Sequence, residues 1–322
     1  MREFDVAVIG AGAWGTALAV QAARAGRRVA LWARDRGRAA AMEAARVNPR
    51  LPGVALSPAI AVVAAIPAAP LILLVVPLQY MRAVAARLPA GGPIAVCAKG
   101  VEAGTLKLPL ELLAEIRPER LAGVLTGPNF AHEVAAGLPA AAVVAGTEEG
   151  VRAAVIAALA SPTFRLYGND DPIGAQVGGA AKNVVAIAAG VVVGAGLGEN
   201  ARAALVTRGL AEMARLAVAL GGRAETVAGL SGLGDLLLTC TGPSSRNFSL
   251  GLELGQGRGL AEILAARSAV TEGVTTAPAL VARAVATGVS MPVAAAVAAV
   301  MRGEMAVPEA IAALLARKLR DE

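Results

Sequence analysis

Lys182 is the side chain with the clearest chemical potential in this sequence. It lies alone in the apolar stretch from Val177 to Gly190, in a chain that has four lysines among its 30 basic residues. Burying an ammonium group is costly unless it is paired, and burial lowers the pKa of a lysine, so such a residue can act as an acid or base near neutral pH. The alternative is a lysine at the edge of a core helix whose ammonium reaches water. The residue alone leaves both interpretations open.

The helical face that carries Lys182 is lined by small residues. The positions one and two turns away are occupied by alanine or glycine: Ala175, Gly178, Gly179, Ala186, Ala189 and Gly190. Interior glycines destabilise a helix by roughly 0.5–1 kcal/mol each relative to alanine. We therefore expect another helix or a ligand to approach this face closely, and a lysine on it can reach into a cleft between domains.

A glycine-rich turn near the N-terminus predicts a dinucleotide site. Gly10-Ala-Gly-Ala-Trp-Gly15 follows a strand-like run and precedes a helical segment, which is the context in which this pattern binds a pyrophosphate. Gly10 permits the tight turn, Gly12 lets the backbone approach the pyrophosphate, and Gly15 lets helix and strand pack closely. The helix N-terminus then favours the anion. An ordinary glycine-rich turn is the alternative.

The end of the second predicted strand bears on cofactor choice. Arg34 is followed there by Asp35. An acidic residue at this place suits the ribose of NAD, whereas an arginine suits the 2′-phosphate of NADP. Arg34 occupies the better position, which favours NADP(H) with NAD(H) tolerated, although a strand-end arginine exposed to water would look the same.

Three further segments carry residues that can bind an anion. Lys99-Gly-Val-Glu102 and Gly127-Pro-Asn-Phe-Ala131 each follow a predicted strand, and ligands of open α/β sheets bind at the carboxyl ends of strands. Later in the chain, Ser245, Arg246 and Asn247 combine residue types that bind phosphate or carboxylate. A polar turn made of the same residues is the alternative for this last segment.

Short apolar runs alternate with helical patterns in the first half of the chain. In the second half, helices are predicted over 199–220, 262–266, 276–286 and 308–319. In the first half, strands are predicted over 4–10, 28–34, 71–76, 94–98, 121–126, 140–145 and 164–168, and helical patterns such as the one over 14–25 separate most of them. This alternation is typical of an α/β fold with a mostly parallel sheet. A helix start at Asp171-Pro172 opens a helical second half. We predict a dinucleotide-binding domain over 1–171 and an all-helical substrate and catalytic domain over 172–322.

Composition argues against several classes of protein. The chain has one histidine, His132, expected as a partly exposed helix residue, and two distant cysteines, Cys97 and Cys240, so a zinc site or a Ser-His-Asp triad is disfavoured. The net charge of +6 is compatible with nucleic-acid binding, but the arginines are scattered and aromatic residues make up 2%. We expect no nucleic-acid partner, no integral membrane segment and no signal peptide, hence a cytoplasmic protein. The oligomeric state stays open, with a homodimer as one candidate.

Taken together, the motifs resemble those of bacterial NAD(P)-dependent glycerol-3-phosphate dehydrogenases. The likeness follows the family's order over nearly the whole chain: Gly10 to Ala19, Lys99 to Glu102, Gly127 to Ala131, Lys182-Asn183, Asn200 to Met213, Gly232 to Thr241, Ser245 to Asn247, and Glu272-Gly273. It implies a Rossmann-type domain followed by an all-α domain, with the active site between them. It also implies reversible NAD(P)H-dependent reduction of dihydroxyacetone phosphate to sn-glycerol 3-phosphate, which supplies the backbone for glycerophospholipid synthesis.

The resemblance also implies a role for each matching position. Lys182 is expected to donate and accept the proton, with Asp235 and Asn183 holding its ammonium and Arg246 and Asn247 anchoring the phosphate. The expected substrate-binding residues are Lys99, Gly127, Asn129, Lys182, Asn183, Asp235, Thr239, Ser245, Arg246 and Asn247. The expected cofactor-binding residues are Gly10, Gly12, Ala13, Trp14, Gly15, Arg34, Lys99, Ala131, Arg246, Val270 and Glu272. No metal is expected.

The sequence departs from the family's usual pattern at four positions. Ala13 stands where a serine is usual, which removes one hydroxyl contact to the cofactor, and Asn129 replaces a common serine or threonine. Ala181 replaces a leucine, and Leu78 replaces a serine. None of these changes removes a charged functional group.

Two other classes of function remain as alternatives. Another reductase with a Rossmann domain and helices, acting on a small hydroxyacid or keto acid, also employs a helical lysine, but often with an asparagine one turn further on, whereas Asn183 is adjacent here. A non-catalytic dinucleotide sensor would keep the glycine-rich turn but would have no need for Lys182 together with Asp235.

Overall fold

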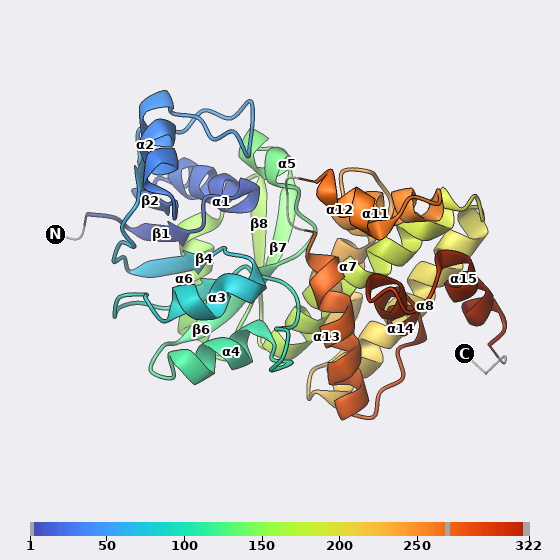
Figure 1. Cartoon of the computed structure of the whole chain (residues 1–322). Coiled ribbons are helices and arrows are strands. Elements are labelled where there is room, and N and C mark those ends of the chain that lie inside the picture. Colours follow the sequence, from blue (N-terminus) through green and yellow to red (C-terminus); the bar gives the residue numbers. More distant parts are fainter. Residues whose placement is uncertain (1–2, 268–270, 318–322) are drawn as a thin grey trace. The chain divides into compact units, whose positions relative to one another are not determined.

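The chain folds into two compact units. The computed structural model describes residues 3–267 and 271–317 (Figure 1). The first unit combines the residues up to Lys99 with Lys107–Ala175, and the second combines Gly100–Leu106 with the residues from Gln176 on. The short segment Gly100–Leu106, which the sequence suggests as part of the first domain, therefore groups with the second unit.

One sheet organises the first unit. Within the described residues, the strands of this sheet are β1 (Val6–Ile9), β2 (Val29–Trp32), β3 (Ile60–Val63), β4 (Leu71–Leu74), β5 (Ile94–Val96), β6 (Ala122–Thr126), β7 (Ala140–Ala145) and β8 (Phe164–Asn169). Their order is β3-β2-β1-β4-β5-β6-β7-β8, and every neighbouring pair is parallel except β6 and β7. The prediction of a mostly parallel sheet is confirmed.

The strand β3 is the element of this sheet that the sequence pattern does not predict. It pairs with β2 alone and lies at one edge of the sheet, where only alternate residues are buried. An edge strand is less completely buried than a central one, so its sequence is less apolar and less distinctive. In addition, Ile60-Ala-Val-Val is followed directly by more alanines, which leaves its end without a sequence signal. The reversed direction of β7 also has no local sequence signature, because strand direction is set by the path of the chain.

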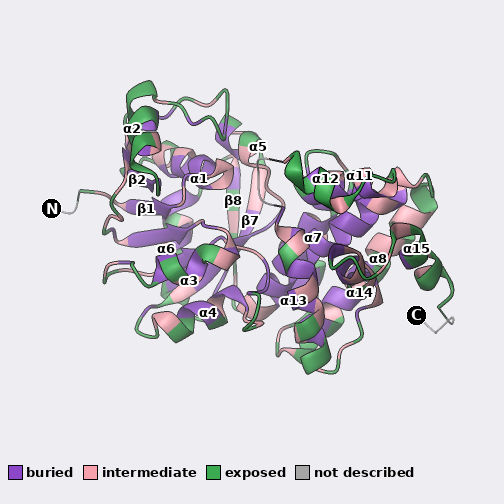
Figure 2. Cartoon of the chain, in the orientation of Figure 1, coloured by how far each residue is buried: buried purple, intermediate pink, exposed green. Residues whose placement is uncertain are grey.

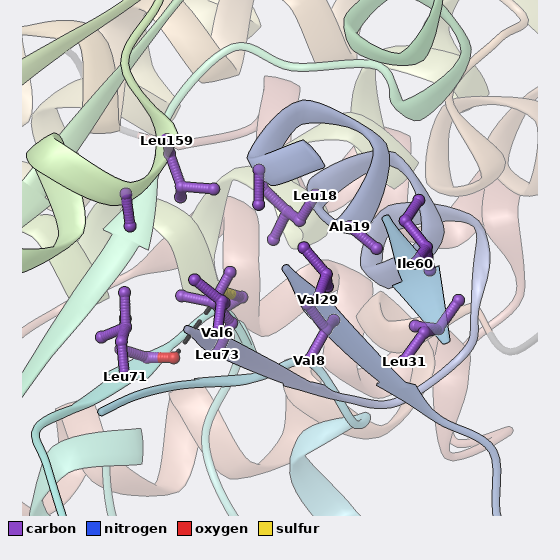
Figure 3. Close-up of a cluster of buried hydrophobic side chains, with 14 of the residues drawn as sticks. Val6, Val8, Leu18, Ala19, Val29, Leu31, Ile60, Leu71, Leu73 and Leu159 are labelled. Carbon is purple, nitrogen blue, oxygen red and sulfur yellow. Dashed lines mark hydrogen bonds between the residues drawn. The ribbon is translucent and has the colours of Figure 1, made fainter. Parts of the chain in front are cut away.

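Helices cover the sheet of the first unit. They are α1 (Ala13–Arg24), α2 (Arg36–Ala45), α3 (Leu78–Ala85), α4 (Pro109–Ile116), α5 (Ala131–Ala136) and α6 (Glu149–Leu159). Side chains alternate between the faces of a strand, so Val6 and Val8 point to the same face. There they share one buried cluster with Leu18 of α1 and Leu159 of α6 (Figure 3). This core holds β1 and α1, and with them the turn that joins the two elements, in a fixed relation.

The described residues of the second unit form helices and no strand. The helices are α7 (Pro172–Gly194), α8 (Glu199–Ala219), α9 (Ala224–Ala228), the π-helix η1 (Leu230–Gly234), α10 (Asp235–Cys240), α11 (Arg246–Gly255), α12 (Leu260–Ala265), α13 (Glu272–Ala286), α14 (Pro292–Met301) and α15 (Val307–Leu315). The all-helical second half is therefore confirmed. The predicted helix start is also confirmed, since the Asp171 carboxylate accepts the Gly174 backbone N–H at 2.9 Å.

The helix α7 is the core of the second unit. It is long and apolar enough to cross a membrane, with a mean hydropathy of 1.7, but 83% of its apolar window is buried within the protein. Figure 2 shows most of this helix as buried. A membrane segment is therefore not the explanation of its apolar sequence.

Close helix packing explains glycines at the C-terminal end of α7. A Cβ added to Gly190 would lie 2.1 Å from the Phe248 carbonyl oxygen, and one added to Gly251 would lie 1.9 Å from the Ile187 carbonyl oxygen. Neither distance is possible, so α7 and α11 pack backbone to backbone here. Of the two partners that the small residues suggest, a helix or a ligand, the structure places a helix at this end.

Candidate active site

The glycine-rich turn lies directly after β1 and leads into α1. A Cβ on Gly10, whose φ is +127°, would lie 2.6 Å from the Val75 carbonyl oxygen, and one on Gly15 would lie 1.9 Å from the Gly10 carbonyl oxygen. These two glycines are therefore required by the fold. A Cβ on Gly12 would meet no atom within 4 Å. The space beside Gly12 is thus open to a ligand, which fits the close approach of a pyrophosphate.

Polar side chains from outside the motif hold this turn in shape, and two of them, Asn48 and Thr16, are buried. The Asn48 amide donates to the Ala11 carbonyl at 3.3 Å and to the Thr16 hydroxyl at 2.6 Å, and the Thr16 hydroxyl donates to the Gly12 carbonyl at 2.8 Å. The Arg38 guanidinium also donates to the Ala11 carbonyl. Asn48 and Arg38 are the residues that the sequence pattern misses here, because they are distant in the chain and belong to no motif.

Other predicted cofactor residues lie around the start of α1. Ala13, Trp14 and Ala131 pack against one small buried cluster between α1 and α5. Arg34 is exposed just beyond the end of β2. The Asp35 carboxylate caps α2 by accepting the Arg38 backbone N–H at 2.6 Å, so it serves the fold as a helix N-cap.

The carboxyl ends of β5 and β6 bring two predicted substrate segments together. These strands are parallel neighbours, and the Lys99 ammonium after β5 lies 3.5 Å from the Gly127 carbonyl oxygen after β6. The Asn129 amide donates to the Ala141 carbonyl at 3.1 Å, while its oxygen is buried without a hydrogen-bond partner in the protein. The neighbouring His132 has a side chain that is 63% exposed on α5, as the sequence predicts.

In the second unit, Lys182 lies at the centre of a buried polar contact. Its side chain is 11% exposed, and its ammonium donates to the Asp235 carboxylate at 2.6 Å and to the Thr239 hydroxyl at 3.0 Å. The Thr239 hydroxyl in turn donates to the Asp235 backbone carbonyl at 2.5 Å. Asp235 is 1% exposed, so the ammonium is its charge partner in a nearly dry environment. This arrangement can keep a protonated amine in place beside a reacting group.

Asn183, the residue after Lys182, takes part in a second polar contact. Asn183 accepts a hydrogen bond from the Asn247 amide at 2.9 Å, and the Asn247 oxygen accepts the Gly273 backbone N–H at 3.0 Å. Asn183 and Asn247 thereby join α7, α11 and the start of α13, and a contact of Asn183 with the Lys182 ammonium stays a prediction.

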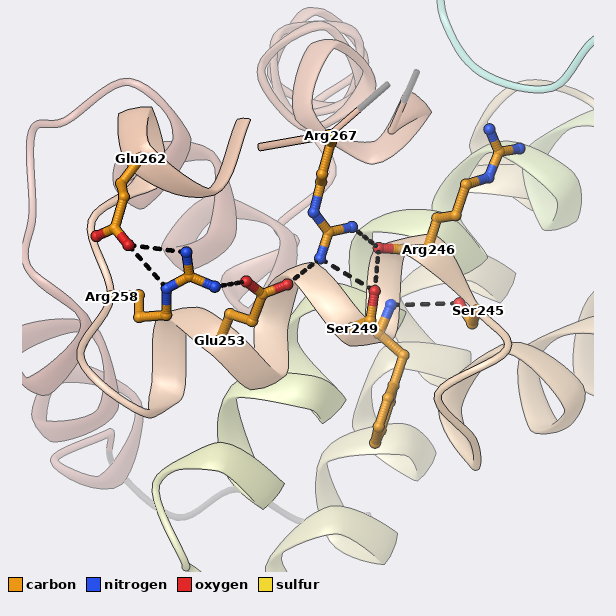
Figure 4. A network of polar contacts seen from close by, with 8 residues as sticks. Ser245, Arg246, Ser249, Glu253, Arg258, Glu262 and Arg267 are labelled. Atoms are coloured by element: carbon orange, nitrogen blue, oxygen red, sulfur yellow. Dashed lines mark hydrogen bonds and ion pairs between the residues drawn. The ribbon is translucent and has the colours of Figure 1, made fainter. Parts of the chain in front are cut away.

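The segment from Ser245 starts α11. The Ser245 hydroxyl accepts the Phe248 backbone N–H at 3.2 Å as the helix N-cap, and Arg246 is the first helical residue, with an exposed side chain. Figure 4 shows how the backbone of Arg246 is held. Its carbonyl accepts hydrogen bonds from Arg267 at 2.9 Å and from Ser249 at 3.2 Å, and Arg267 is paired with the Glu253 carboxylate. The Arg246 backbone is thus fixed while its guanidinium extends outward.

The structure gathers the predicted site residues into two groups. One lies in the first unit and contains Gly10, Gly12, Ala13, Trp14, Gly15, Arg34, Lys99, Gly127, Asn129 and Ala131. The other lies in the second unit and contains Lys182, Asn183, Asp235, Thr239, Ser245, Arg246, Asn247 and Glu272, the first residue of α13. Val270 lies outside the described residues.

Neither cysteine belongs to the two groups of predicted site residues. Cys97 and Cys240 are both free and buried, and burial raises the pKa of each thiol to about 12. Within the described residues, no group of three or more histidine, cysteine, aspartate or glutamate side chains could hold a metal ion. Because both thiols have a pKa of about 12, neither cysteine supplies a thiolate nucleophile at neutral pH.

Comparison with known proteins covers almost the whole chain. Residues 5–151 match the family model for the N-terminus of NAD-dependent glycerol-3-phosphate dehydrogenase, and residues 171–312 match the model for its C-terminus. The chain is 57% identical over 319 residues to glycerol-3-phosphate dehydrogenase (NAD(P)+) of Acidiphilium cryptum, covering 99% of this chain and 98% of that protein. It is 53% identical over 325 residues to the protein of the same name from Caulobacter vibrioides, covering 98% of each. The crystal structure of glycerol-3-phosphate dehydrogenase from Coxiella burnetii superposes with a TM-score of 0.93 at 37% identity, covering 98% of this chain and 99% of that one.

Proposed function

Since the chain belongs to the NAD-dependent glycerol-3-phosphate dehydrogenase family, its activity is that of an NAD(P)-dependent glycerol-3-phosphate dehydrogenase, and we propose that Lys182 is the proton donor and acceptor of the reaction. The reaction is the reversible reduction of dihydroxyacetone phosphate to sn-glycerol 3-phosphate. The buried contact of the Lys182 ammonium with Asp235 at 2.6 Å is the observation that carries this role.

A ketone reduction is promoted by an acid that can stabilise negative charge beside the carbonyl oxygen, and an ammonium group can do both. Negative charge grows on that oxygen as the carbon is reduced, and an ammonium placed there stabilises the charge and then delivers its proton. Asp235 and Thr239 keep the Lys182 side chain in one orientation, so little reorganisation is needed during the reaction. In the reverse direction the neutral amine accepts the proton of the alcohol.

The phosphate of the substrate is assigned to the start of α11. The Arg246 guanidinium matches the geometry of an anion, and the first backbone N–H groups of a helix of this length favour negative charge. Asn247 retains one amide hydrogen beyond its bond to Asn183. Lys99, Gly127 and Asn129 of the first unit complete the proposed substrate set, together with Ser245, and anchoring the phosphate fixes the carbonyl relative to Lys182.

The glycine-rich turn is the proposed site of the dinucleotide pyrophosphate. The space beside Gly12 and the N-terminus of α1 supports this assignment. Bound NAD(P)H supplies the hydride. Arg34, exposed after β2, favours NADP(H) over NAD(H), and Ala131 and Glu272 are further proposed contacts. In the cell, we propose a cytoplasmic enzyme whose product supplies the backbone of glycerophospholipids.

The substrate is tested by comparing ketones of different charge. Oxidation of NADPH and of NADH is measured with dihydroxyacetone phosphate and with a small keto acid as the control. We expect turnover with the phosphorylated ketone. Turnover with the keto acid alone would refute the substrate assignment.

Two substitutions test the residue roles. Lys182→Ala should lower kcat by about 10²–10⁴-fold while the dinucleotide still binds, and near-normal turnover would refute the proton-transfer role. Arg246→Ala removes a charge-assisted contact and should raise the KM for dihydroxyacetone phosphate by about tenfold or more. An unchanged KM would remove Arg246 as the phosphate anchor.

A further inference from the structure

A π-helical turn leads directly into Asp235. The Gly234 backbone N–H donates to the Gly229 carbonyl at 3.1 Å, and the Asp235 backbone N–H reaches the Leu230 carbonyl, in each case five residues back. Such turns are rare, and they shift the direction in which the following side chains point relative to an α-helix. The direction of the Asp235 side chain therefore depends on η1.

The backbone of this turn rests against a glycine of α7. A Cβ added to Gly178 would lie 2.5 Å from the Ser231 carbonyl oxygen and 3.1 Å from the Gly232 Cα. Gly178 is one helical turn before Lys182 and lies on the same face of α7. The helix α7 and the segment from η1 to Asp235 thus make two contacts, Gly178 with Ser231 and Lys182 with Asp235. The two contacts are four residues apart in both segments.

We propose that Gly178 and the π-helical turn together position the Asp235 carboxylate against the Lys182 ammonium. This inference rests on the proposed role of Lys182 in proton transfer. Gly178 is a positioning residue, because it acts through Asp235 and not on the substrate. The absence of a side chain at Gly178 lets η1 approach α7 closely enough for the 2.6 Å contact between Lys182 and Asp235.

The size of the effect follows from the distances. A Cβ does not come within 3.0 Å of a carbonyl oxygen, so a methyl group at position 178 must displace η1 by at least about half an ångström. The three nearest neighbours of that methyl group are all backbone atoms, which cannot rotate away as a flexible side chain can. Catalytic groups need to be held within about 0.5 Å of their productive geometry, so this displacement is large enough to reduce turnover.

A matched control lies on the same helix. A Cβ added to Gly194 would lie 2.1 Å from the Leu252 carbonyl oxygen, which is a clash of the same kind with α11. Gly194 is the last residue of α7 and lies three turns beyond Lys182. Gly194→Ala should therefore disturb packing without moving Asp235.

The experiment compares Gly178→Ala with Gly194→Ala in the full-length protein. We expect both variants to melt at a lower temperature than the parent. Only Gly178→Ala should lower kcat per folded molecule, by about ten- to a hundredfold, with little change in the KM for dihydroxyacetone phosphate or in NADPH affinity. An equal kcat in the two variants would overturn the positioning role.

Two further measurements keep the result interpretable. If Gly178→Ala does not fold, Ser231→Ala tests the same coupling from the turn, because it removes the hydrogen bond from the Ser231 hydroxyl to the Thr226 carbonyl at 3.2 Å. It should lower kcat several-fold with KM unchanged, and a parental kcat would contradict the inference. A parent protein that does not reduce dihydroxyacetone phosphate would refute the proposed function itself, which separates the two failures.

Discussion

The buried pair of Lys182 and Asp235 predicts that stability and activity can be separated by a double substitution. Removing one partner of a buried ion pair leaves an uncompensated charge and costs about 3–5 kcal/mol, whereas replacing both partners by uncharged groups of similar volume is often close to neutral. The Lys182 side chain is 11% exposed and Asp235 is 1% exposed, so the full cost applies to Lys182→Met. The double variant, which adds Asp235→Asn, should recover about 2–4 kcal/mol of the free energy of unfolding.

The assay is urea unfolding followed by circular dichroism, together with turnover measurements on the same samples. Both Lys182 variants should have kcat lowered by about 10²–10⁴-fold, although the double variant is nearly as stable as the parent. The control is Arg302→Met, which breaks an exposed ion pair with Glu304 and should change unfolding little. Asp235→Asn is measured alone as well. If the losses of Lys182→Met and Asp235→Asn simply add in the double variant, the two charges do not interact in solution and the predicted coupling is refuted.

The remaining predictions concern the dinucleotide turn and one buried carboxyl group. Gly15→Ala should prevent folding of the first unit because its Cβ has no room, whereas Gly12→Ala should fold normally and weaken NADPH binding. Thermal melting and NADPH titration check both variants. A folded Gly15→Ala protein, or a Gly12→Ala protein that binds NADPH as the parent does, would contradict the assigned roles. Asn48→Leu should cost about 1–3 kcal/mol of stability and also weaken NADPH binding, because the Ala11 carbonyl and the Thr16 hydroxyl lose a donor; unchanged NADPH affinity would show that Asn48 does not shape the turn. Burial raises the pKa of Glu212 above its ordinary value of 4.5, although its carboxylate accepts two N–H groups at the start of α14 at 2.7 and 3.2 Å. When the pKa of a group is higher in the folded than in the unfolded protein, its contribution to stability is present at a pH below the unfolded pKa and is lost as the pH rises through the folded pKa. Over this pH range the free energy of unfolding of Glu212→Gln should therefore fall less than that of the parent. Parallel pH profiles of the two proteins would contradict the raised pKa.

Local sequence signals were sufficient for the elements that position the site. The run before Gly10 and the helical pattern after Gly15 predict a strand, a turn and a helix, and the structure has β1 and α1 there. The helix start at Asp171 and the helical periodicity beyond it likewise predict the second unit. These features depend on the steric preferences and the periodicity of a few neighbouring residues, and both can be seen in the sequence itself.

The sequence by itself therefore determined that a glycine-rich strand–turn–helix precedes an all-helical half, and that Lys182 is an unusual lysine in an apolar helix. Only the tertiary structure decided that Asp235 and Thr239, more than fifty positions away in the chain, hold its ammonium. Asn48, 37 positions from the glycine turn, likewise entered the site only through the fold. The physical reason is that contacts between distant residues depend on how closely backbones pack and on the register of each helix. No local pattern encodes the π-helical turn η1, which sets this register before Asp235.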